Sequence, residues 1–409
     1  MEIQSLFADR IGGTQFGKGT AIYKFEKIKR AKRAAREAHP EREMLDFGVG
    51  EPDQMAPRVI RQALKKAVDD PENRGYADNG IAAFKEAAAR YMEGFFGVTG
   101  LDPEREINHT IGSKPALAML PLAFVNPGDS VLVTTPGYPV LATHTRYLGG
   151  TVLPVPLLEK NGYFPDLKAL EASTDLSRTK LFYVNYPNNP TGTAATPKFF
   201  DELIAFAQRH GMLIVQDAAY ATLVYGRERL SILSRPGGKE TAIELHSMSK
   251  SYNMTGWRLG FVAGSAPVVK AVAEIKDNID SGQFKAIQVA ACAGIADLRL
   301  SEKIRAHYQR RLRKLVQILK SAGFRAKMPG GTFYLYVPAP KGTADGHTFA
   351  NAEEAAQYLI TECGISTVPW DDAGAYLRFG ATFESAGTAD DARVLDELGR
   401  RLRAAQWVF

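Results

Sequence analysis

Cysteine is nearly absent from this sequence. Cys292 and Cys363 are the only two among 409 residues, and neither belongs to a CxxC pair. A disulfide framework or a cysteine-ligated zinc site needs more cysteines at closer spacing, so this scarcity argues against both. So few thiols are typical of a protein in a reducing compartment, and we expect a cytoplasmic location.

Long hydrophobic runs are missing as well. The longest clearly apolar stretch, residues 116–125, is about half the length of a membrane-spanning helix. The opening segment MEIQSLFADR carries an acid at position 2 and no long apolar core, so it does not resemble a secretory signal. With 45% hydrophobic and 23% charged residues, the chain is expected to be a soluble globular protein of more than one packed region, without a membrane partner.

Neither sign of charge is in large excess. The chain has 51 Lys and Arg against 45 Asp and Glu, and its net charge of +6 suits anionic substrates or a phosphate-bearing cofactor. The most basic stretch, residues 24–43, could be a nucleic-acid-binding arm. However, Phe25, Ile28 and Ala31 recur at helical spacing, which favours an amphipathic helix with a solvated charged face. We therefore predict no nucleic-acid partner.

Motifs of several common enzyme classes are also missing. No GxGxxG follows a strand pattern, and HExxH and GxSxG do not occur, so dehydrogenase, zinc protease and esterase functions lack support. GGTQFGKG (12–19) nearly spells a phosphate loop, but Gly19 occupies the hydroxyl position and no strand precedes it, so we interpret it as a flexible arm. His109, His144 and His246 lack the spacing of metal ligands, and no metal site is predicted.

The sequence does contain alternating strand and helix patterns between about residues 110 and 265. Between two apolar runs, TPKFFDELIAFAQRHG (196–211) predicts a helix with Thr196 as cap, Pro197 at its first position and Gly211 after its end. The alternation predicts an α/β fold with a mostly parallel sheet covered by helices on both faces. The predicted strands are 131–135, 151–155, 181–185, 212–217 and 242–247.

Beyond about residue 285 the pattern changes to that of a smaller α+β domain. We predict an N-terminal arm with part of the small domain over 1–45, a large domain over 46–284 and a small C-terminal domain over 285–409. The segments behind the last prediction are a helix at 302–323, a strand at 332–337, a helix near 350–362 and a strand at 376–382.

Unusual polar residues follow three of the predicted strands. Asn189 stands in YPNNPTG after the strand at 181–185. Asp217, followed by Tyr220, ends the next strand along the chain, and Lys250 follows the strand at 242–247. Because ligands collect at the carboxyl ends of strands in an open parallel sheet, we expect these residues to lie at one edge.

Lys250 suits covalent chemistry better than a surface position. A free lysine has a pKa of about 10.4, so its amine is nucleophilic only in a special setting. Ser247 and Ser249 precede this lysine, and Arg258 can form a charge-assisted clamp on a phosphate. We therefore predict that Lys250 bonds to the aldehyde of a phosphorylated cofactor.

The other polar residues suit pyridoxal phosphate. This cofactor needs an anion beside its ring nitrogen, which Asp217 could supply, although a helix cap at the end of the strand is the alternative. Tyr220 and Asn189 could reach the ring hydroxyl, whereas NNPTG is equally a turn signal. IGSKPAL (111–117) is typical of a helix start whose backbone amides can bind phosphate.

NYPNNPTG, DAAY and SMSKSYNMTGWRLG, in this order, resemble the fold-type I pyridoxal-phosphate aminotransferases of class I and II over nearly the whole chain. The resemblance implies a homodimer with shared active sites, acting on small amino acids and 2-oxo acids. It implies that Lys250 holds the cofactor and moves the proton, and that Asp217 pairs with the ring nitrogen. The ring-oxygen partners that it implies are Asn189 and Tyr220.

The resemblance also assigns the remaining contacts of cofactor and substrate. The phosphate cradle comprises Ser247, Arg258 and the amides of Ser113 and Lys114, and Tyr138 stacks on the ring. Tyr76 reaches the phosphate in the neighbouring subunit. Arg378 clamps the substrate α-carboxylate, and the other residues beside the substrate are Gly50, Tyr138 and Asn189.

Further segments resemble the LL-diaminopimelate aminotransferase family, which makes tetrahydrodipicolinate for lysine synthesis with 2-oxoglutarate as amino acceptor. Lys114 resembles the lysine that binds the distal carboxylate, and Tyr23 of the partner chain resembles its polar neighbour, although Tyr23 could equally pack an arm. Asp78, Asn79 and residues 278–283 are further candidates, but RGYADNG is one residue shorter than the plant-type loop, so its acidic contact does not transfer. The segments are RGYADNGIAAFKEAAARYM, EINHTIGSKPAL, TPGYPVLATHTRYLGG, KDNIDSGQFKAIQ and STVPWDDAG.

Three alternatives stay open from the sequence. One is an aspartate, alanine or aromatic aminotransferase of broader specificity. Another is a pyridoxal-phosphate-dependent lyase, because the cofactor alone does not fix which bond breaks. The third is a regulatory protein that uses this fold to bind an effector, which is disfavoured because no appended helix-turn-helix pattern is present.

Overall fold

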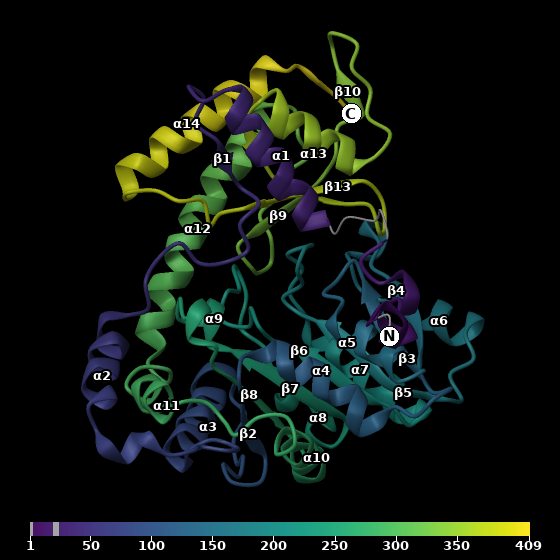
Figure 1. Ribbon diagram of the computed structural model, residues 1–409, viewed down its shortest axis with the longest axis vertical. Helices are drawn as coiled ribbons and strands as arrows, with labels where there is room; N and C mark the ends of the chain where they lie inside the picture. Colours follow the sequence, from purple (N-terminus) through teal and green to yellow (C-terminus); the bar gives the residue numbers. More distant parts are fainter. Residues whose placement is uncertain (1–2, 19–23) are drawn as a thin grey trace.

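The computed structural model describes residues 3–18 and 24–409 of the chain. In Figure 1 a larger part with a seven-stranded sheet lies below a smaller part, and the long helix α12 (Leu298–Ser321) runs from one to the other. Tyr23 lies outside the described residues.

The large sheet has the strand order β2-β8-β7-β6-β5-β3-β4. Strands β3 to β7 are parallel to one another and match the five predicted strands, whereas β2 and β8 pair antiparallel and were not predicted. The predicted mostly parallel α/β fold is confirmed. The strands are β2 (Ile107–Thr110), β3 (Ser130–Thr135), β4 (Thr151–Pro156), β5 (Thr179–Asn185), β6 (Leu213–Asp217), β7 (Ala242–Ser247) and β8 (Gly260–Gly264).

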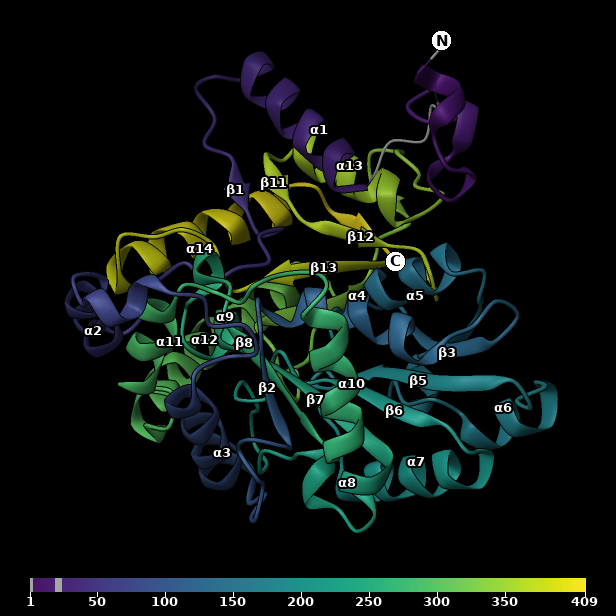
Figure 2. The same cartoon turned by 60° about the horizontal axis from the view of Figure 1, so that its bottom comes forward.

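Helices cover both faces of this sheet, which is why its central strands are almost uniformly apolar (Figure 2). Side chains alternate along a strand, so Phe182 packs into the core on one face while its neighbours Leu181 and Tyr183 pack into the core on the other. The predicted strand at 151–155 is confirmed as β4, but its expected cover on both faces is not, because β4 forms a sheet edge and leaves Thr151, Pro154 and Pro156 exposed. The helices of this part are α2 (Arg58–Val68), α3 (Ala82–Phe96), α4 (Ser113–Phe124), α5 (Val140–Tyr147), α6 (Leu167–Ser173), α7 (Pro197–His210), α8 (Gly238–Thr241), α9 (Met248–Ser251), α10 (Ala266–Lys276) and α11 (Lys285–Cys292).

Helix α7 begins and ends where its sequence signals predict. The hydroxyl of Thr196 accepts a hydrogen bond from the Phe199 amide at 3.1 Å, and Pro197 occupies the first helical position. Gly211 ends the helix with a left-handed backbone (φ 64°), a conformation that glycine adopts without steric cost.

The smaller part combines the N-terminal segment with the C-terminal third of the chain. Strand β1 (Leu45–Asp46) pairs in parallel with β11 (Ile365–Ser366), and α1 (Lys24–Ala38) packs against α13 (Ala352–Thr361). Charged residues of α1 form ion pairs, such as Lys27 with Glu353. The other elements are β9 (Tyr334–Pro338), β10 (Gly342–Thr343), β12 (Val368–Trp370), β13 (Tyr376–Gly380), β14 (Trp407–Val408) and α14 (Thr388–Ala404).

The predicted domain boundaries can be compared with the packed cores. The core of the smaller part includes Leu45 and Phe47 together with Leu312 of α12. Ala290 and Ile295 pack in the core of the larger part, beyond the predicted boundary at residue 284. The division into domains stays a prediction.

Residues 12–18 differ from the predicted arm. They follow the short 3₁₀ helices η1 (Ile3–Leu6) and η2 (Asp9–Ile11) and include a third, η3 (Gly13–Gln15). The Gln4 amide donates to the carbonyl oxygens of Thr14 and Phe16. This segment therefore folds into short helical turns closed by a side chain.

Candidate active site

A cavity of about 560 Å³ lies at the carboxyl ends of β5, β6 and β7, between the two parts of the chain. Both parts contribute to its wall, so the site depends on how they pack together. The predicted residues that line it are Gly50, Ser113, Lys114, Tyr138, Asn189, Asp217, Tyr220, Ser247, Lys250, Arg258 and Arg378. A wider groove of about 770 Å³ beside α1 shares Gly48 and Val49 with it.

The register of the sheet brings the strand ends together. Asn185, the last residue of β5, pairs with Asp217, the last residue of β6. The Asn185 side-chain amide donates to the Asp217 carbonyl oxygen at 2.7 Å. Because adjacent parallel strands lie about 4.8 Å apart, the residues that follow β5, β6 and β7 meet in one cavity.

Lys250 presents its amine to this cavity from the end of α9. Burial lowers the pKa of Lys250 to about 8, and the positive charges of Arg258 and Arg378 act in the same direction. The Nζ atom donates to the carbonyl oxygen of Gly50 at 2.8 Å. A lowered pKa leaves more of the amine unprotonated near neutral pH, as a nucleophilic lysine requires.

Asp217 is a buried carboxylate at the base of the cavity. Burial raises the pKa of Asp217 to about 6, although hydrogen bonds from the Ala219 amide (3.2 Å) and the Tyr183 hydroxyl (3.3 Å) favour its ionised form. The alternative for Asp217, a helix cap, does not apply, because a turn rather than a helix follows β6 and the Ala219 bond lies within that turn. This bond uses Oδ1, whereas the Tyr183 hydroxyl donates to Oδ2. Asp217 lines the cavity with only 5% of its surface exposed.

Arg378 is the most deeply buried cation of the site, with 3% of its surface exposed. Its Nη1 donates to Asn189 Oδ1 at 2.9 Å and its Nη2 donates to the Gly48 carbonyl at 3.2 Å. The guanidinium lies over the Tyr334 ring at 4.0 Å, while Nε has no hydrogen-bond partner among the described residues. No carboxylate neutralises Arg378 within the described chain, so its charge is available to an anionic ligand.

The Tyr220 hydroxyl faces the same space. It lies 3.2 Å from the hydroxyl of Tyr334. Tyr334 donates its one proton to the Gly50 carbonyl at 3.3 Å, so Tyr220 is the donor between the two hydroxyls. Tyr334 thereby links Tyr220 to the segment that Lys250 contacts.

A cationic cradle lies at the other end of the cavity. Gly112 precedes α4 with a positive φ of 77°, and a β-carbon there would lie 2.4 Å from Arg258 Nη2. The glycine therefore lets the guanidinium approach the amides of the first turn of α4, which begins at Ser113. Free amides and a helix dipole favour an anion at this position, and Arg258 adds a full charge.

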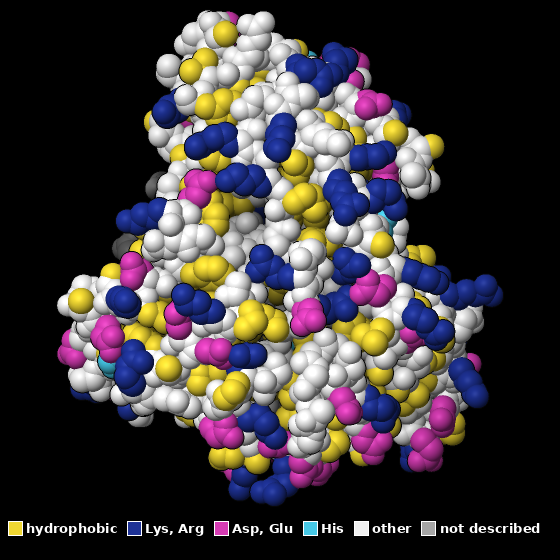
Figure 3. Space-filling model, turned by 180° about the vertical axis from the view of Figure 1, so that it is seen from behind, with side chains coloured by type: hydrophobic (Ala, Val, Ile, Leu, Met, Phe, Trp, Pro, Cys, Tyr) yellow, Lys and Arg dark blue, Asp and Glu magenta, His cyan; other side chains and the backbone are white. Residues whose placement is uncertain are grey.

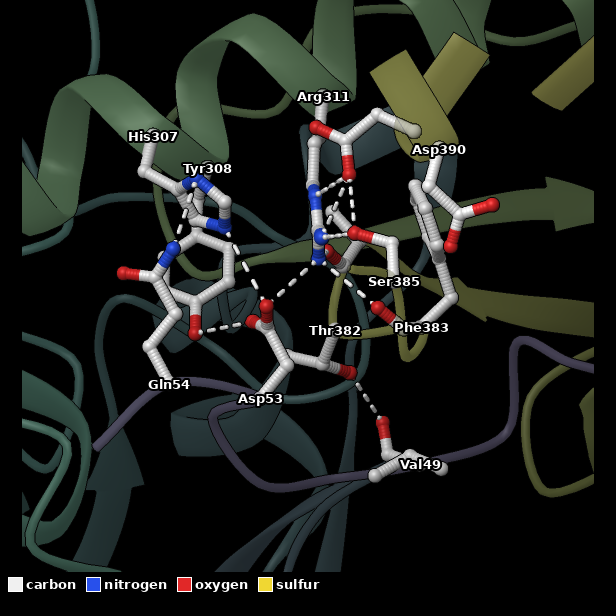
Figure 4. Close-up of polar contacts among 12 residues, drawn as sticks. Val49, Asp53, Gln54, His307, Tyr308, Arg311, Thr382, Phe383, Ser385 and Asp390 are labelled. Carbon is white, nitrogen blue, oxygen red and sulfur yellow. Dashed lines mark hydrogen bonds and ion pairs between the residues drawn. The ribbon is translucent and has the colours of Figure 1, made fainter. Parts of the chain in front are cut away.

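Residues 48–51 form one wall of the cavity, and a buried network fixes the segment through Val49 and Asp53 (Figure 4). Asp53 accepts from the Tyr308 hydroxyl at 3.0 Å and pairs with Arg311 at 3.1 Å. Thr382 donates to the Val49 carbonyl at 2.8 Å. These contacts from the smaller part hold the backbone that accepts bonds from Lys250 and Arg378.

Some predicted residues lie away from the cavity. Tyr76 is 81% exposed and does not line it. Asn79 bonds instead to Asp277 (2.7 Å) and Asn108 (2.9 Å), and the Asp78 carbonyl accepts from Lys276.

Other residues line or support the cavity without having been predicted. They are Gly48, Val49, Glu51, Asn185, Ala219, Ser249, Thr255, Tyr183 and Tyr334. Both tyrosines sit in apolar strand patterns, LFYVN and TFYLYV, where a ring is expected to be core. Asn185 carries a usable signal, because it is a polar residue at the end of an apolar run.

The donor set fits pyridoxal phosphate. An amine with a lowered pKa can bond to an aldehyde, a buried carboxylate can face a cationic ring nitrogen, and the cradle at α4 can hold a phosphate. Among the described residues there is no group of three or more His, Cys, Asp or Glu that could hold a metal ion.

The model of the family "Aminotransferase class I and II" matches residues 42–395. A relative from Methanococcus maripaludis named LL-diaminopimelate aminotransferase is 53% identical, with 100% of this chain and 99% of the relative covered. A relative of the same name from Methanocaldococcus jannaschii is 52% identical, with the same coverage. A solved structure of a Thermus thermophilus aspartate aminotransferase double mutant has a TM-score of 0.83 and 26% identity, covering 97% of this chain and 99% of that one.

The family match extends across both parts of the chain and includes every predicted residue that lines the cavity. The chain therefore belongs to the class I and II aminotransferases, and its cofactor is pyridoxal 5′-phosphate.

Proposed function

We propose that this chain is an LL-diaminopimelate aminotransferase, which exchanges the amino group of LL-2,6-diaminopimelate with the oxo group of 2-oxoglutarate. The products are tetrahydrodipicolinate, formed when the resulting oxo acid cyclises, and L-glutamate. The observation that carries the proposal is identity of 53% and 52% over the full chain to two relatives of that name.

The proposed chemistry assigns a role to each end of the cavity. When bound, the cofactor supplies an aldehyde that takes up the amino group and a ring that withdraws electrons from the substrate Cα. Lys250 holds the aldehyde carbon between turnovers and moves the proton between Cα and that carbon, for which its amine must be neutral. Its pKa of about 8 supports this role, because a substantial neutral fraction exists near pH 7 to 8.

Asp217 keeps the ring nitrogen protonated, while Tyr220 and Asn189 support the ring oxygen. Its burial supports this role, since water competes poorly for a carboxylate so enclosed. Tyr138, half-buried at the cavity wall, stacks on the ring. The phosphate is held by Ser247, Arg258 and the backbone amides of Ser113 and Lys114.

Arg378 binds the α-carboxylate of both substrates. Its burial beside Gly48 and Asn189, without a carboxylate partner in the described chain, supports a bidentate clamp. Gly50 and Tyr138 flank this position, and Lys114, exposed at the cavity wall, binds the distal carboxylate. The assignment of Tyr23 to the partner's distal subsite rests on the sequence resemblance alone.

We propose a homodimer with shared active sites. Large apolar side chains are exposed on and around α2 and α11, which pack against each other. A second copy of the chain would cover these side chains. Tyr76 lies on this side of the chain and would reach the partner's cavity. The exposed residues are Met55, Val59, Tyr76, Ile279, Phe284 and Val289.

We propose that the protein acts in the cytoplasm and binds neither nucleic acid nor a membrane. Its two cysteines are free, which suits a reducing compartment. On the face in Figure 3, Lys and Arg are interspersed with Asp, Glu and apolar side chains rather than gathered in a continuous stripe. Within the part of the chain that the structure describes, no helix is long and apolar enough to cross a membrane.

The decisive test is the substrate profile of the purified holoenzyme. LL-diaminopimelate, meso-diaminopimelate, aspartate and alanine are compared as donors to 2-oxoglutarate, with glutamate and the 2-aminobenzaldehyde adduct of the cyclised product both measured. The proposal expects the highest kcat/KM and both products with LL-diaminopimelate. A higher kcat/KM with aspartate or alanine favours the broader aminotransferase, cleavage without glutamate favours the lyase, and no turnover despite bound cofactor favours the regulator.

A further inference from the structure

Arg258 adopts an unusual backbone conformation. Its φ of 56° and ψ of 48° are left-handed, a region that residues other than glycine rarely adopt. The residue follows the 3₁₀ helix η7 (Thr255–Trp257), and its Nη1 donates to the Thr255 carbonyl at 2.8 Å and to Ser249 Oγ at 3.3 Å. Such a conformation persists only where surrounding contacts fix it.

Gln283 supplies contacts of this kind. It lies between α10 and α11, with 9% of its surface exposed. Its Nε2 donates to the carbonyl oxygens of Trp257 at 2.6 Å and Arg258 at 2.8 Å. One side-chain amide thus binds the peptide groups on both sides of the Arg258 α-carbon.

Gln283 is itself held in a single orientation. Its Oε1 lies 3.1 Å from Nε2 of the buried His109. Because carbonyl oxygens only accept, the Nε2 of Gln283 must face them and its Oε1 must accept from His109, whose proton then sits on Nε2. Burial lowers the pKa of His109 to about 4, so the imidazole stays neutral near pH 7.

The backbone around Gln283 is also fixed. Gln288 Nε2 donates to the Gln283 carbonyl at 3.1 Å, and Lys276 bonds to Asp280 at 2.5 Å. Gly282 has a φ of 84°, and a β-carbon there would lie 2.5 Å from the Asp78 amide nitrogen. This segment therefore provides a rigid support for its side chains.

The position of the Arg258 backbone matters because its guanidinium has little room. The β-carbon that Gly112 lacks would meet Nη2 at 2.4 Å, so a small rotation about Arg258 would move the guanidinium into or away from the first turn of α4. Such a movement of the guanidinium would weaken its charge-assisted hydrogen bond to an anion.

We propose that Gln283 is a positioning residue, which fixes Arg258 so that its guanidinium and the α4 amides bind the cofactor phosphate together. The inference rests on the proposed role of Arg258 and deepens it. Gln283 does not touch the cavity, so its effect passes through the Trp257 and Arg258 peptide groups.

The test compares a cofactor that has a phosphate with one that lacks it. Holoenzyme is stripped of cofactor and titrated with pyridoxal 5′-phosphate and separately with pyridoxal, and bound cofactor is followed by absorbance. Gln283→Met is near in size and removes both the amide nitrogen that donates to the Trp257 and Arg258 carbonyls and the amide oxygen that accepts from His109. It should lower the affinity for pyridoxal 5′-phosphate by about 10- to 100-fold, the range typical of losing a residue that orients a ligand-binding side chain. The affinity for pyridoxal should be nearly unchanged.

Four further variants keep the result interpretable. Gln283→Asn retains the amide, but its shorter side chain withdraws that amide from the two carbonyl oxygens. It replaces Gln283→Met in the test if that variant does not fold, and the same selective loss of affinity for pyridoxal 5′-phosphate is expected. Gln208→Met, on the outer helix α7, removes a hydrogen bond from the Gln208 side-chain amide to the Thr241 hydroxyl of α8 (3.1 Å) and should change neither affinity. Arg258→Ala should show the selective loss, and adding Gln283→Met to it should cost little more.

The outcomes separate the two claims. Equal losses for both cofactors, or no loss, in a folded Gln283 variant overturn the positioning role. If Arg258→Ala does not show a phosphate-selective loss, the proposed role of Arg258 fails, and with it the basis of the inference.

Discussion

Asp217→Asn should stabilise the cofactor-free protein while it impairs cofactor binding. Burial raises the pKa of Asp217 to about 6, compared with its ordinary value of 3.8. A folded-state pKa above the unfolded value means that the folded chain binds the proton more tightly, so stability falls as pH rises from about 4 to 6. This difference in pKa of about 2 lowers the free energy of unfolding by about 3 kcal/mol above pH 6, because a pKa difference of 1 is worth about 1.4 kcal/mol.

Asparagine avoids this cost because it is neutral at every pH. Its Oδ1 can still accept from the Ala219 amide, and the Tyr183 hydroxyl can turn to accept from its Nδ2. The cofactor-free variant should therefore exceed the parent in free energy of unfolding by up to about 3 kcal/mol at pH 8, and the gain should vanish near pH 4.

Cofactor binding should show the opposite preference. A cationic ring nitrogen needs the ionised carboxylate, so below pH 6 binding must first remove the Asp217 proton. The affinity of the parent, relative to that of Asp217→Asn, should fall about tenfold between pH 7 and pH 5. Using the variant as reference cancels the titration of Lys250 and of the phosphate, which both proteins share.

Urea unfolding of the cofactor-free proteins at equal concentration, and cofactor titration at pH 5 to 8, measure the two effects. A variant less stable than the parent at pH 8, or a ratio of affinities that is flat between pH 5 and 7, would refute the reasoning. Either result would mean that burial of the ionised Asp217 does not destabilise the cofactor-free protein, or that the cofactor does not stabilise the ionised form.

Three other substitutions have expected effects. Arg378→Leu should raise KM for both amino and oxo substrates by about 10- to 100-fold or more, since charged hydrogen bonds are lost, with cofactor affinity little changed in steady-state and titration assays. Arg311→Met leaves Asp53 and Asp391 buried without their shared cation (3.1 Å and 2.7 Å) and should lower the free energy of unfolding in urea by about 3–5 kcal/mol. Gly112→Ala places a methyl group against Arg258 at a backbone φ of 77°. It should lower the affinity for pyridoxal 5′-phosphate but not for pyridoxal in equilibrium titrations. An unchanged affinity for pyridoxal 5′-phosphate would show that the cradle has room for the methyl group.

Periodicity and turn chemistry predict the local structure of much of the large sheet. Five strands and helix α7 lie where apolar runs, Thr196 and Gly211 place them. Strands β2 (INHT) and β8 (GFVAG) escaped prediction because one is polar and the other is rich in glycine and alanine. They are strands because β8 pairs with β7, and β2 in turn pairs with β8.

The residues of the candidate site could be predicted from the sequence for a different reason. Asn189, Asp217 and Lys250 follow consecutive strands of one sheet, so topology alone predicts that they meet. Contacts across long sequence separations could not be predicted, because no local pattern encodes them. The pair of Asp53 with Arg311 and the approach of Gln283 to Arg258 depend on how distant segments pack.

The covalent role of Lys250 is the claim on which the rest depends, and chemical trapping tests it directly. The holoenzyme is reduced with borohydride, digested, and its cofactor-bearing peptide is sequenced by mass spectrometry. We predict one modified residue, Lys250, and loss of both the modification and turnover in Lys250→Ala. Cofactor fixed to another lysine, or near-normal turnover in that variant, would contradict the account.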